Sequence, residues 1–514
     1  LASSSTLWGA VSWTGNTCTI TGDATVAQIN ACLTDGSTGI VAQGKTGEIT
    51  VQLPADTQAW TSGISINMRD ATYINVTSLI IKGAGTIPTG STKGSAGLTI
   101  IQASGGVAET GNGQEVNCYG AGVLFNITVP TGKKFRITNL EMGESFCTAI
   151  GVITFNGSTS PTNGGGFRAD HIDITSTRYF GCKYPSGTTK ECPSPRAFQV
   201  YDPYGVIDHN KIHVRSMASA VYPTNGNNGW AKPVVFGSLD TVAFEDNSTD
   251  HLGTSWPNYM VCDARNGARL TVRNNTIYDG YIGTHGFDNS DRAPALVEAY
   301  NNSLIVTMTG AEARLNWRGG NFFAYNNTIT TTGSGNVYEN NIMFKYHRRM
   351  ADYTNYPWGV DYCDATLRRA CFGSVVRRGY ICTDDANCGG SAGQYNYCQY
   401  IDGTGGYPCR DQIGVMNTHT TSTYSNTYQL ANQPNLFWNN TYNGNYVTPT
   451  GKESTVNTVI QNNRDYCHSA NTGTDTYGVT GGSPPAALAT CNSKATTYIP
   501  IVYPHPLVGG AVDT

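Results

Sequence analysis

The chain has 514 residues, of which 32 are basic and 36 acidic, giving a formal net charge of −4. There is no basic excess with which to neutralise phosphates, so we expect no nucleic-acid partner. No apolar run approaches the roughly 20 residues that a membrane-spanning helix needs, so we expect no membrane span.

The 15 cysteines favour an oxidising compartment, where disulfides persist. The sequence begins Leu1-Ala-Ser without a methionine, so we expect a removed signal peptide and a secreted, extracellular protein. Because 15 is an odd number, one thiol is predicted to be free or bonded outside the chain. Cys262, which stands alone among the repeats described below, is the candidate for a buried structural thiol.

Residues 1–60 lack the repeat of the following chain and are predicted to form an N-terminal cap. Cys18 and Cys32 flank the segment Ala24–Ala31, whose sequence favours a short helix. A short helix closed by a disulfide would cover the edge of the first strand, which otherwise invites pairing with another chain.

Between residues 61 and 345, short apolar strands alternate with turn-forming pairs. Asn275, Asn302 and Asn327 each end an Asn-Asn pair, at spacings of 302 − 275 = 27 and 327 − 302 = 25 residues. Such a period indicates stacked units, here of parallel strands about 4.8 Å apart, with an asparagine ladder along the stack. The alternative interpretation is that the asparagine pairs mark turns in an ordinary β-sandwich.

The segment Asp263-Ala-Arg-Asn-Gly-Ala-Arg-Leu-Thr-Val-Arg-Asn-Asn-Thr-Ile277 resembles secreted proteins of the pectate-lyase-like superfamily, as do Ile282–Asp288, Glu298–Asn302 and Arg318–Gly320. The general pattern of strands and turns resembles these proteins over residues 60–345, and individual residues can be recognised over 263–330. It implies an all-β fold, a right-handed parallel β-helix (β-solenoid) with an N-terminal cap and a disulfide-rich insertion. The Arg-x-Pro-x-x-Arg element of common pectate lyases is incomplete here, since Val297 stands where the second arginine is expected.

The character of the sequence changes after residue 345. Residues 346–420 hold six irregularly spaced cysteines and are predicted to form a Cys-rich insertion lobe with local disulfides. Residues 421–514 return to the repeat as C-terminal coils, with Cys467 and Cys491 available for a disulfide. The proline-rich segment Tyr498–Leu507 is predicted to be an extended strap over the last coil.

Ionisable residues concentrate between 285 and 318 in a chain with few charges. A constant period of 27 places His285 beside Glu312 and Asp291 beside Arg318, with Arg292 and Arg314 nearby; these six are the candidate catalytic residues. The candidate substrate-binding residues are Asp263, Arg269, Arg273 and Asp288.

Two chemistries fit these candidates. The resemblance implies a lyase in which Arg292, Arg314 and Arg318 face a uronate, with Ca²⁺ as the candidate metal at Asp288 and Asp291. A hydrolase would instead use a carboxylate pair such as Asp291 and Glu312. The alternative is that the charges form salt bridges between adjacent turns.

Tyr300 and Tyr325 hold equivalent positions, two residues before their ladder asparagines, and Arg273 is in line with them. We therefore expect a stack of two tyrosine rings. If the stack faces inward it belongs to the core, whereas an outward stack would be a platform for sugar rings.

Glycosylation sequons are present at Asn75, Asn156 and Asn439, which are the predicted acceptors. Asn274, Asn301 and Asn326 also match the sequon pattern, but each is the first residue of a repeated pair and is therefore expected in the ladder. The function predicted from the sequence is binding or cleavage of an acidic polysaccharide. The alternative is a non-catalytic extracellular structural protein that self-associates into a fibre, matrix or filament.

Overall fold

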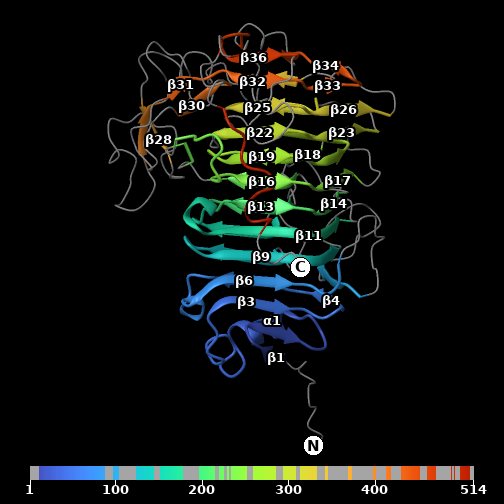
Figure 1. Cartoon of the computed structure of the whole chain (residues 1–514), viewed down its shortest axis with the longest axis vertical. Coiled ribbons are helices and arrows are strands. Elements are labelled where there is room, and N and C mark those ends of the chain that lie inside the picture. The colour runs from blue at the N-terminus through green and yellow to red at the C-terminus, as the bar shows by residue number, and fades with distance from the viewer. Residues whose placement is uncertain are drawn as a thin grey trace, which may run out of the picture.

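The computed structural model describes residues 11–86, 97–103, 123–143, 151–176, 196–214, 219–224, 229–230, 233–251, 259–284, 293–307, 313–332, 342–344, 369–372, 397–400, 413–417, 430–451, 460–470, 488, 491 and 498–509. In this part of the chain nearly all regular structure is β-strand, so the all-β prediction is confirmed (Figure 1). The α-helix α1 (Val26–Leu33) has eight residues, and the described chain contains no helix able to cross a membrane. Two short 3-10 helices are η1 (Ala71–Tyr73) and η2 (Pro161–Asn163).

The described strands form two long sheets and two hairpins. The large sheet contains β1 (Val11–Thr14), β2 (Thr17–Ile20), β3 (Gly47–Gln52), β4 (Thr57–Trp60), β6 (Val76–Lys82), β7 (Thr99–Ala103), β9 (Lys134–Gly143), β11 (Gly166–Ser176), β13 (Gly205–Asp208), β14 (Lys211–Val214), β16 (Val242–Glu245), β17 (Ser248–His251), β19 (Arg269–Arg273), β20 (Thr276–Tyr278), β22 (Leu296–Tyr300), β23 (Ser303–Val306), β25 (Phe322–Tyr325), β26 (Thr328–Thr331), β32 (Asn435–Trp438), β33 (Thr441–Tyr442), β34 (Asn445–Tyr446) and β36 (Tyr466–Ser469). The second sheet contains β5 (Ile64–Asn67), β8 (Phe125–Val129), β10 (Gly151–Gly157), β12 (Arg196–Tyr201), β15 (Ser219–Thr224), β18 (Tyr259–Ala264), β21 (Gly280–Thr284), β24 (Leu315–Trp317), β27 (Ile342–Phe344) and β35 (Pro449–Gly451). The hairpins are β28 (Arg369–Phe372) with β29 (Tyr397–Tyr400), and β30 (Val415–Asn417) with β31 (Leu430–Asn432).

From β12 to β27 the chain repeats one order: a strand of the second sheet, then two strands of the large sheet. Each strand pairs in parallel with its equivalent three strands later, as in β13–β16–β19–β22–β25 and β15–β18–β21–β24. The ribbons accordingly lie one above another along the long axis (Figure 1). This parallel pairing excludes the alternative of an antiparallel sandwich for this region.

The corner between the two large-sheet strands of each unit is two residues long. Its first residue is left-handed, for example Asn274 with φ 56° and Asn301 with φ 55°, a conformation that asparagine tolerates. Its second residue belongs to a ladder. The side-chain Nδ2 of Asn275 donates to Asn302 Oδ1 at 3.0 Å, and Nδ2 of Asn302 donates to Asn327 Oδ1 at 2.9 Å. The predicted asparagine ladder is confirmed.

The ladder extends beyond the three predicted asparagines, from Asn210 at one end to Asn440 at the other. Each ladder amide also donates to a backbone carbonyl, as Asn302 does to Val272 at 2.9 Å. The ladder thus supplies partners for backbone groups that would otherwise be buried without hydrogen bonds at the corners.

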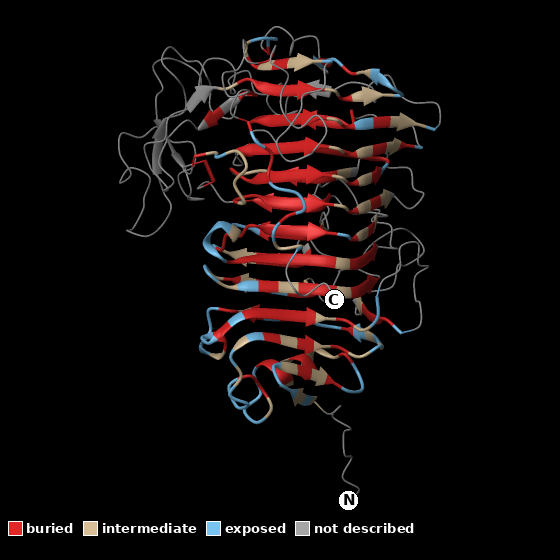
Figure 2. Ribbon diagram, in the orientation of Figure 1, coloured by how far each residue is buried: buried red, intermediate tan, exposed pale blue. Residues whose placement is uncertain are grey.

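The core lies between the two sheets, where inward side chains of both are buried (Figure 2). Trp317 of the second sheet stacks on Phe322 of the large sheet, with ring centroids 5.2 Å apart. Cys262 points into this core, is fully buried and forms no disulfide, so the prediction for this thiol is confirmed. Burial raises the pKa of the Cys262 thiol well above its usual value, which keeps it protonated and unreactive.

The N-terminal cap contains the predicted helix and disulfide. Thr25 caps α1 by accepting from Gln28 N–H, and Cys18 is bonded to Cys32. However, β3 lies inside the predicted cap and already pairs in parallel with β6, so parallel stacking begins before residue 61. Near the other end, the predicted disulfide between Cys467 and Cys491 is also present.

The C-terminal segment 498–509, hereafter the tail, differs from its prediction. It does not stop over the last repeats but runs back along the outer face of the large sheet, drawn in red in Figure 1. Tyr498 packs on Trp438 of β32, whereas the Val508 carbonyl accepts from Arg168 of β11 at 3.3 Å. The reason is the row of outward aromatic and charged side chains in these strands, which the tail covers and hydrogen-bonds.

Candidate functional site

The described candidate residues do not lie on one flank. Asp263 lies on β18, and Arg314 and Arg318 flank β24, all in the second sheet. Arg269 and Arg273 begin and end β19 of the large sheet. The remaining candidates lie outside the described residues, and they are His285, Asp288, Asp291, Arg292 and Glu312.

The period behind the predicted neighbours holds in the large sheet between β19 and β25 but not in the second sheet. In the large sheet Arg273 pairs with Tyr300, an offset of 27, but in the second sheet Ile282 pairs with Leu315, an offset of 33. Chain length between the sheets varies from unit to unit, so a spacing measured at the ladder does not carry over. Arg318 therefore lies level with the end of β21, where its N–H donates to Thr284 Oγ1 at 2.8 Å. The offset of 27 used to pair Asp291 with Arg318 therefore does not apply to this sheet, and the pairing stays untested because Asp291 lies outside the described residues.

Arg273 is fully buried under the tail. Its guanidinium pairs with Glu245, with Nε 2.7 Å from Oε2, and donates to the carbonyls of Ile501 at 2.8 Å and Val502 at 2.9 Å. It also donates to Tyr300 Oη at 2.9 Å. Burial raises the pKa of Glu245, although the charge of Arg273 opposes that shift. These contacts give Arg273 a structural role rather than the predicted contact with substrate.

The predicted tyrosine stack is present and extends to a third ring. Tyr300 and Tyr325 are 4.6 Å apart at 6°, and Tyr325 and Trp438 are 4.2 Å apart at 5°. The rings face outward from the sheet, opposite the inward Ala299 and Ala324 of the core. Yet Tyr498 of the tail packs edge-on against Tyr325 and Trp438, and all three stacked rings are fully buried. The stack is thus neither inward core nor an exposed sugar platform.

Arg269 and Arg314 are also buried. Arg269 donates to the carbonyl of Pro233 at 2.8 Å, and Arg314 donates to the carbonyl of Asp279 at 3.1 Å. Both arginines thus donate hydrogen bonds to backbone carbonyls of neighbouring segments of the chain.

Asp263 belongs to a cluster that sequence reasoning did not find. Two guanidiniums contact the ring of Tyr222 on β15: Arg196 Cζ lies 3.4 Å from the ring centroid and Arg265 Cζ lies 4.6 Å from it. Arg265 in turn donates to Asp263 Oδ2 at 3.1 Å. We call Arg196, Tyr222, Asp263 and Arg265 the arginine–tyrosine cluster.

Strand register brings the cluster together. Arg196 begins β12, and β12 pairs with β15, which carries Tyr222. Val221 pairs with Cys262, so Tyr222 and Asp263, the next residues, are neighbours on the outer side of the second sheet. Arg265 follows β18 and bridges to Thr224. The four residues come from three units of the repeat and share no sequence motif. The one signal available was Asp263-Ala-Arg265 within the segment that carries the resemblance.

The cluster brings two arginines and one aspartate together around a buried tyrosine ring. Cation–π contact with Tyr222 holds both guanidiniums in place, and Arg265 also pairs with Asp263. Burial lowers the pKa of the Arg196 guanidinium from its usual value. On β12, Gln199 pairs with Tyr222, and Tyr201, two residues further along, is 38% exposed. An anionic group fits this cluster better than a cationic one.

No group of three or more His, Cys, Asp and Glu side chains suited to a metal ion is found among the residues that the structure describes. The predicted calcium ligands Asp288 and Asp291 lie outside them.

The predicted glycosylation acceptors occupy different environments. Asn75 is exposed. The Asn156 side chain donates to Asn126 Oδ1 at 2.7 Å, and the Asn439 side chain donates to Asn326 Oδ1 at 2.8 Å. Asn439 is also a left-handed corner residue, with φ 49°, and so belongs to the same column as the asparagines assigned to the ladder.

No protein family matches this chain, and no curated protein or solved structure shows significant similarity to it.

Proposed function

We propose that the chain is a secreted right-handed parallel β-helix that binds an acidic polysaccharide through the arginine–tyrosine cluster. The helical winding is supported by the repeated order of strands, their parallel register and the asparagine ladder. Secretion is supported by the disulfides Cys18–Cys32 and Cys467–Cys491.

One observation carries the proposed ligand class: two guanidiniums converge on one tyrosine ring, and one of them also pairs with Asp263. Guanidiniums bind carboxylates through paired, charge-assisted hydrogen bonds. Tyr222 itself is buried, but the ring of Tyr201 is 38% exposed and offers the apolar face of a sugar a stacking surface. A polymer of uronate residues presents both features at each repeat, which suits a surface built on successive parallel strands.

The same cluster suits cleavage by β-elimination. In that reaction a base removes the proton beside the uronate carboxylate, and the bond to the leaving glycosidic oxygen breaks to leave an unsaturated sugar. In this proposal Arg196, whose pKa is lowered by burial, acts as the base. Arg265 pairs with the carboxylate of the uronate. Asp263 would orient Arg265 by the hydrogen bond already present.

The test is binding and turnover on polygalacturonate, alginate and chondroitin, with a neutral polysaccharide for comparison. Retention in affinity electrophoresis reports binding, and ultraviolet absorbance of unsaturated products reports elimination. We expect Arg196→Gln and Arg265→Gln each to weaken binding roughly tenfold or more, since each removes charge-assisted hydrogen bonds. The matched control is Arg69→Gln, which removes an exposed arginine at the N-terminal end of the chain. Equal affinity in all variants would refute the proposed site.

The second candidate function is a non-catalytic structural protein of an extracellular fibre, matrix or filament. It is favoured by the tail, which covers the large-sheet face where an outward aromatic stack would otherwise be open to a ligand. In that case the purified protein would assemble into ordered fibres visible by electron microscopy. The cluster variants would then alter neither assembly nor affinity for acidic polymers.

A further inference from the structure

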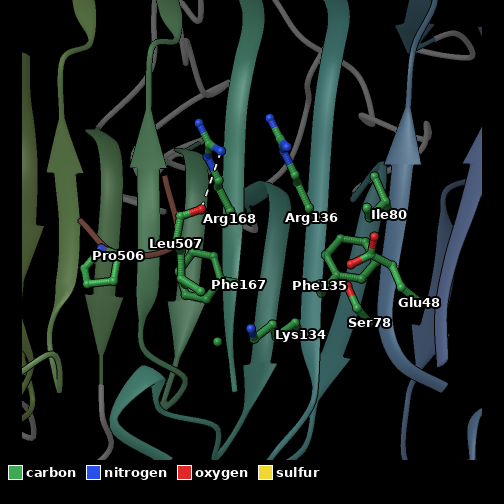
Figure 3. A pocket seen from close by; sticks show the side chains of 11 residues that line it. Glu48, Ser78, Ile80, Lys134, Phe135, Arg136, Phe167, Arg168, Pro506 and Leu507 are labelled. Carbon is green, nitrogen blue, oxygen red and sulfur yellow. Dashed lines mark hydrogen bonds between the residues drawn. The ribbon is translucent and has the colours of Figure 1, made fainter. Parts of the chain in front are cut away.

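A hollow of about 120 Å³ opens on the outer face of the large sheet, beside the end of the tail (Figure 3). Strands β3, β6, β9 and β11 form its floor, and Pro506 and Leu507 of the tail form one wall. It lies on a different sheet from the arginine–tyrosine cluster and shares no residue with it.

The floor is made of outward side chains in register. Glu48 pairs with Ser78, Ser78 with Lys134, and Lys134 with Gly166. These four positions therefore form a row across four strands, roughly 14 Å from end to end at about 4.8 Å per strand. The neighbouring row contains Ile80, Arg136 and Arg168.

The tail wall is held by the sheet itself. Arg168 donates to the Leu507 carbonyl at 3.5 Å, as Figure 3 shows, and to the Val508 carbonyl at 3.3 Å. Leu507 lies directly over Gly166, where an added Cβ would be only 2.9 Å from Leu507 Cδ1. Gly166 also has φ 134°, which other residues rarely adopt. Glycine at 166 thus lets the tail close one end of the hollow without filling it.

The row presents three polar side chains with their hydrogen-bonding capacity unused. Within the described chain, no hydrogen bond or ion pair engages the side chains of Glu48, Ser78 or Lys134. Arg136 differs, because it already forms a bidentate pair with Asp170, at 2.8 Å and 2.6 Å. The hollow therefore offers a carboxylate, a hydroxyl and an ammonium in a row, beside the apolar side chains of Ile80 and Leu507.

We propose that this hollow binds a single carboxylated sugar ring, such as a uronate residue. The sugar carboxylate pairs with Lys134, next to the positive edge of Arg136. Ring hydroxyls donate to Glu48 and bond to Ser78, and an apolar ring face lies on Ile80 and Leu507. This inference rests on the proposed affinity for acidic glycans, but it uses none of the cluster residues, so the two sites can fail independently.

The experiment is calorimetric titration of the full chain with galacturonic acid, and with galactose as the uncharged counterpart. We expect the acid to bind at least about tenfold more tightly than galactose, because only the acid pairs with Lys134. Lys134→Gln should abolish that preference, and Ser78→Leu should weaken both sugars by filling the hollow. The matched control Lys82→Gln removes a lysine from the same sheet outside the hollow and should leave binding unchanged.

Two outcomes would overturn the site. One is the absence of any preference for the acid over galactose in the unmodified chain. The other is equal weakening by Lys134→Gln and Lys82→Gln, which would indicate only a general charge effect. The variant Arg196→Gln separates the two sites, since it should weaken polygalacturonate binding while galacturonic acid still binds in the hollow.

Discussion

The outer faces of the two sheets use charge differently. On the large sheet, under and beside the tail, Arg273 pairs with Glu245, Arg168 with Asp208 and Arg136 with Asp170. On the second sheet two guanidiniums share one tyrosine ring, and one of them, Arg265, pairs with Asp263. Charged residues are present on both faces, so their presence alone does not identify a binding site. The useful distinction is how far each pair is buried: Arg273 and Glu245 are fully buried, whereas the Arg265 and Asp263 side chains are 15% and 11% exposed.

The largest effect is expected where a buried pair is broken. Glu245→Ala leaves the Arg273 guanidinium buried without its carboxylate and should lower the free energy of unfolding by about 3–5 kcal/mol. Denaturant unfolding monitored by tryptophan fluorescence measures this loss. The counterpart on the second sheet is Asp263→Ala, which removes the partner of Arg265 and should cost less, because the Arg265 side chain is 15% exposed and that of Arg273 is fully buried. If Glu245→Ala and Asp263→Ala lost similar amounts of unfolding free energy, the two faces would not differ in how their ion pairs contribute to stability.

A smaller loss is expected where the tail meets the aromatic stack. Tyr498 Oη donates to Glu298 Oε1 at 2.6 Å, and burial raises the pKa of that carboxyl. Tyr498→Phe keeps the edge-on packing but removes the donor, at a cost of about 1.5–3 kcal/mol. Hydrogen exchange of β22 and β25 amides should quicken in this variant. Unchanged exchange and unchanged stability would show that the tail holds the face by packing alone.

On the second sheet the sharper readout is binding rather than stability. Tyr222→Leu keeps an apolar side chain but removes the ring that holds Arg196 and Arg265. We expect the affinity for polygalacturonate to fall roughly tenfold, with a stability loss near the 0.5–2 kcal/mol of cation–π contacts. Affinity electrophoresis and thermal melting on the same samples separate the two effects. A large drop in melting temperature with unchanged affinity would make the cluster a structural feature like the covered face.

The smallest effect is expected at the rim of the covered face. The hydrogen bond from His209 to Asp208 raises the pKa of His209, with Asp246 adding to the shift and burial and Arg168 opposing it. A raised folded-state pKa means that this stabilisation is complete below the unfolded value near 6.5 and is lost as pH rises through the folded value. Because the His209 side chain is 44% exposed, the change should stay below about 1 kcal/mol.

His209→Asn tests this pH dependence, because asparagine tolerates the left-handed corner, where φ is 53°. The unmodified chain should lose stability between pH 6 and pH 8 relative to the variant. Parallel pH profiles of the two proteins would contradict the assignment.

The parts of the fold that could be predicted from the sequence are those set by short-range spacing. The two-residue corners fix the register of the large sheet, so Asn275, Asn302 and Asn327 could be aligned without coordinates. The second sheet could not be aligned in this way, because connections of unequal length precede its strands: the offset is 20 from Cys262 to Ile282 and 33 from Ile282 to Leu315.

The arginine–tyrosine cluster was missed for the same reason. Arg196, Tyr222 and Arg265 meet only through that second register, and nothing in their local sequence marks them as neighbours. The path of the tail could not be predicted either. Its prolines predict an extended segment, but the hydrogen bond between Tyr498 and Glu298 joins residues 200 positions apart, and no local sequence pattern indicates it.

The path of the tail also bears on how the molecule is made. The carbonyls that complete the surroundings of Arg273 belong to Ile501 and Val502, near the end of the 514-residue chain. During synthesis the aromatic column of Tyr300, Tyr325 and Trp438 therefore stays uncovered until the segment from Tyr498 to Val502 has also been translated. A polypeptide that ends before Tyr498 would leave this aromatic surface exposed permanently. Chaperones and proteases recognise exposed apolar surfaces of this kind. The tail thus distinguishes chains that contain it from shorter fragments, because only chains with the tail cover the aromatic column.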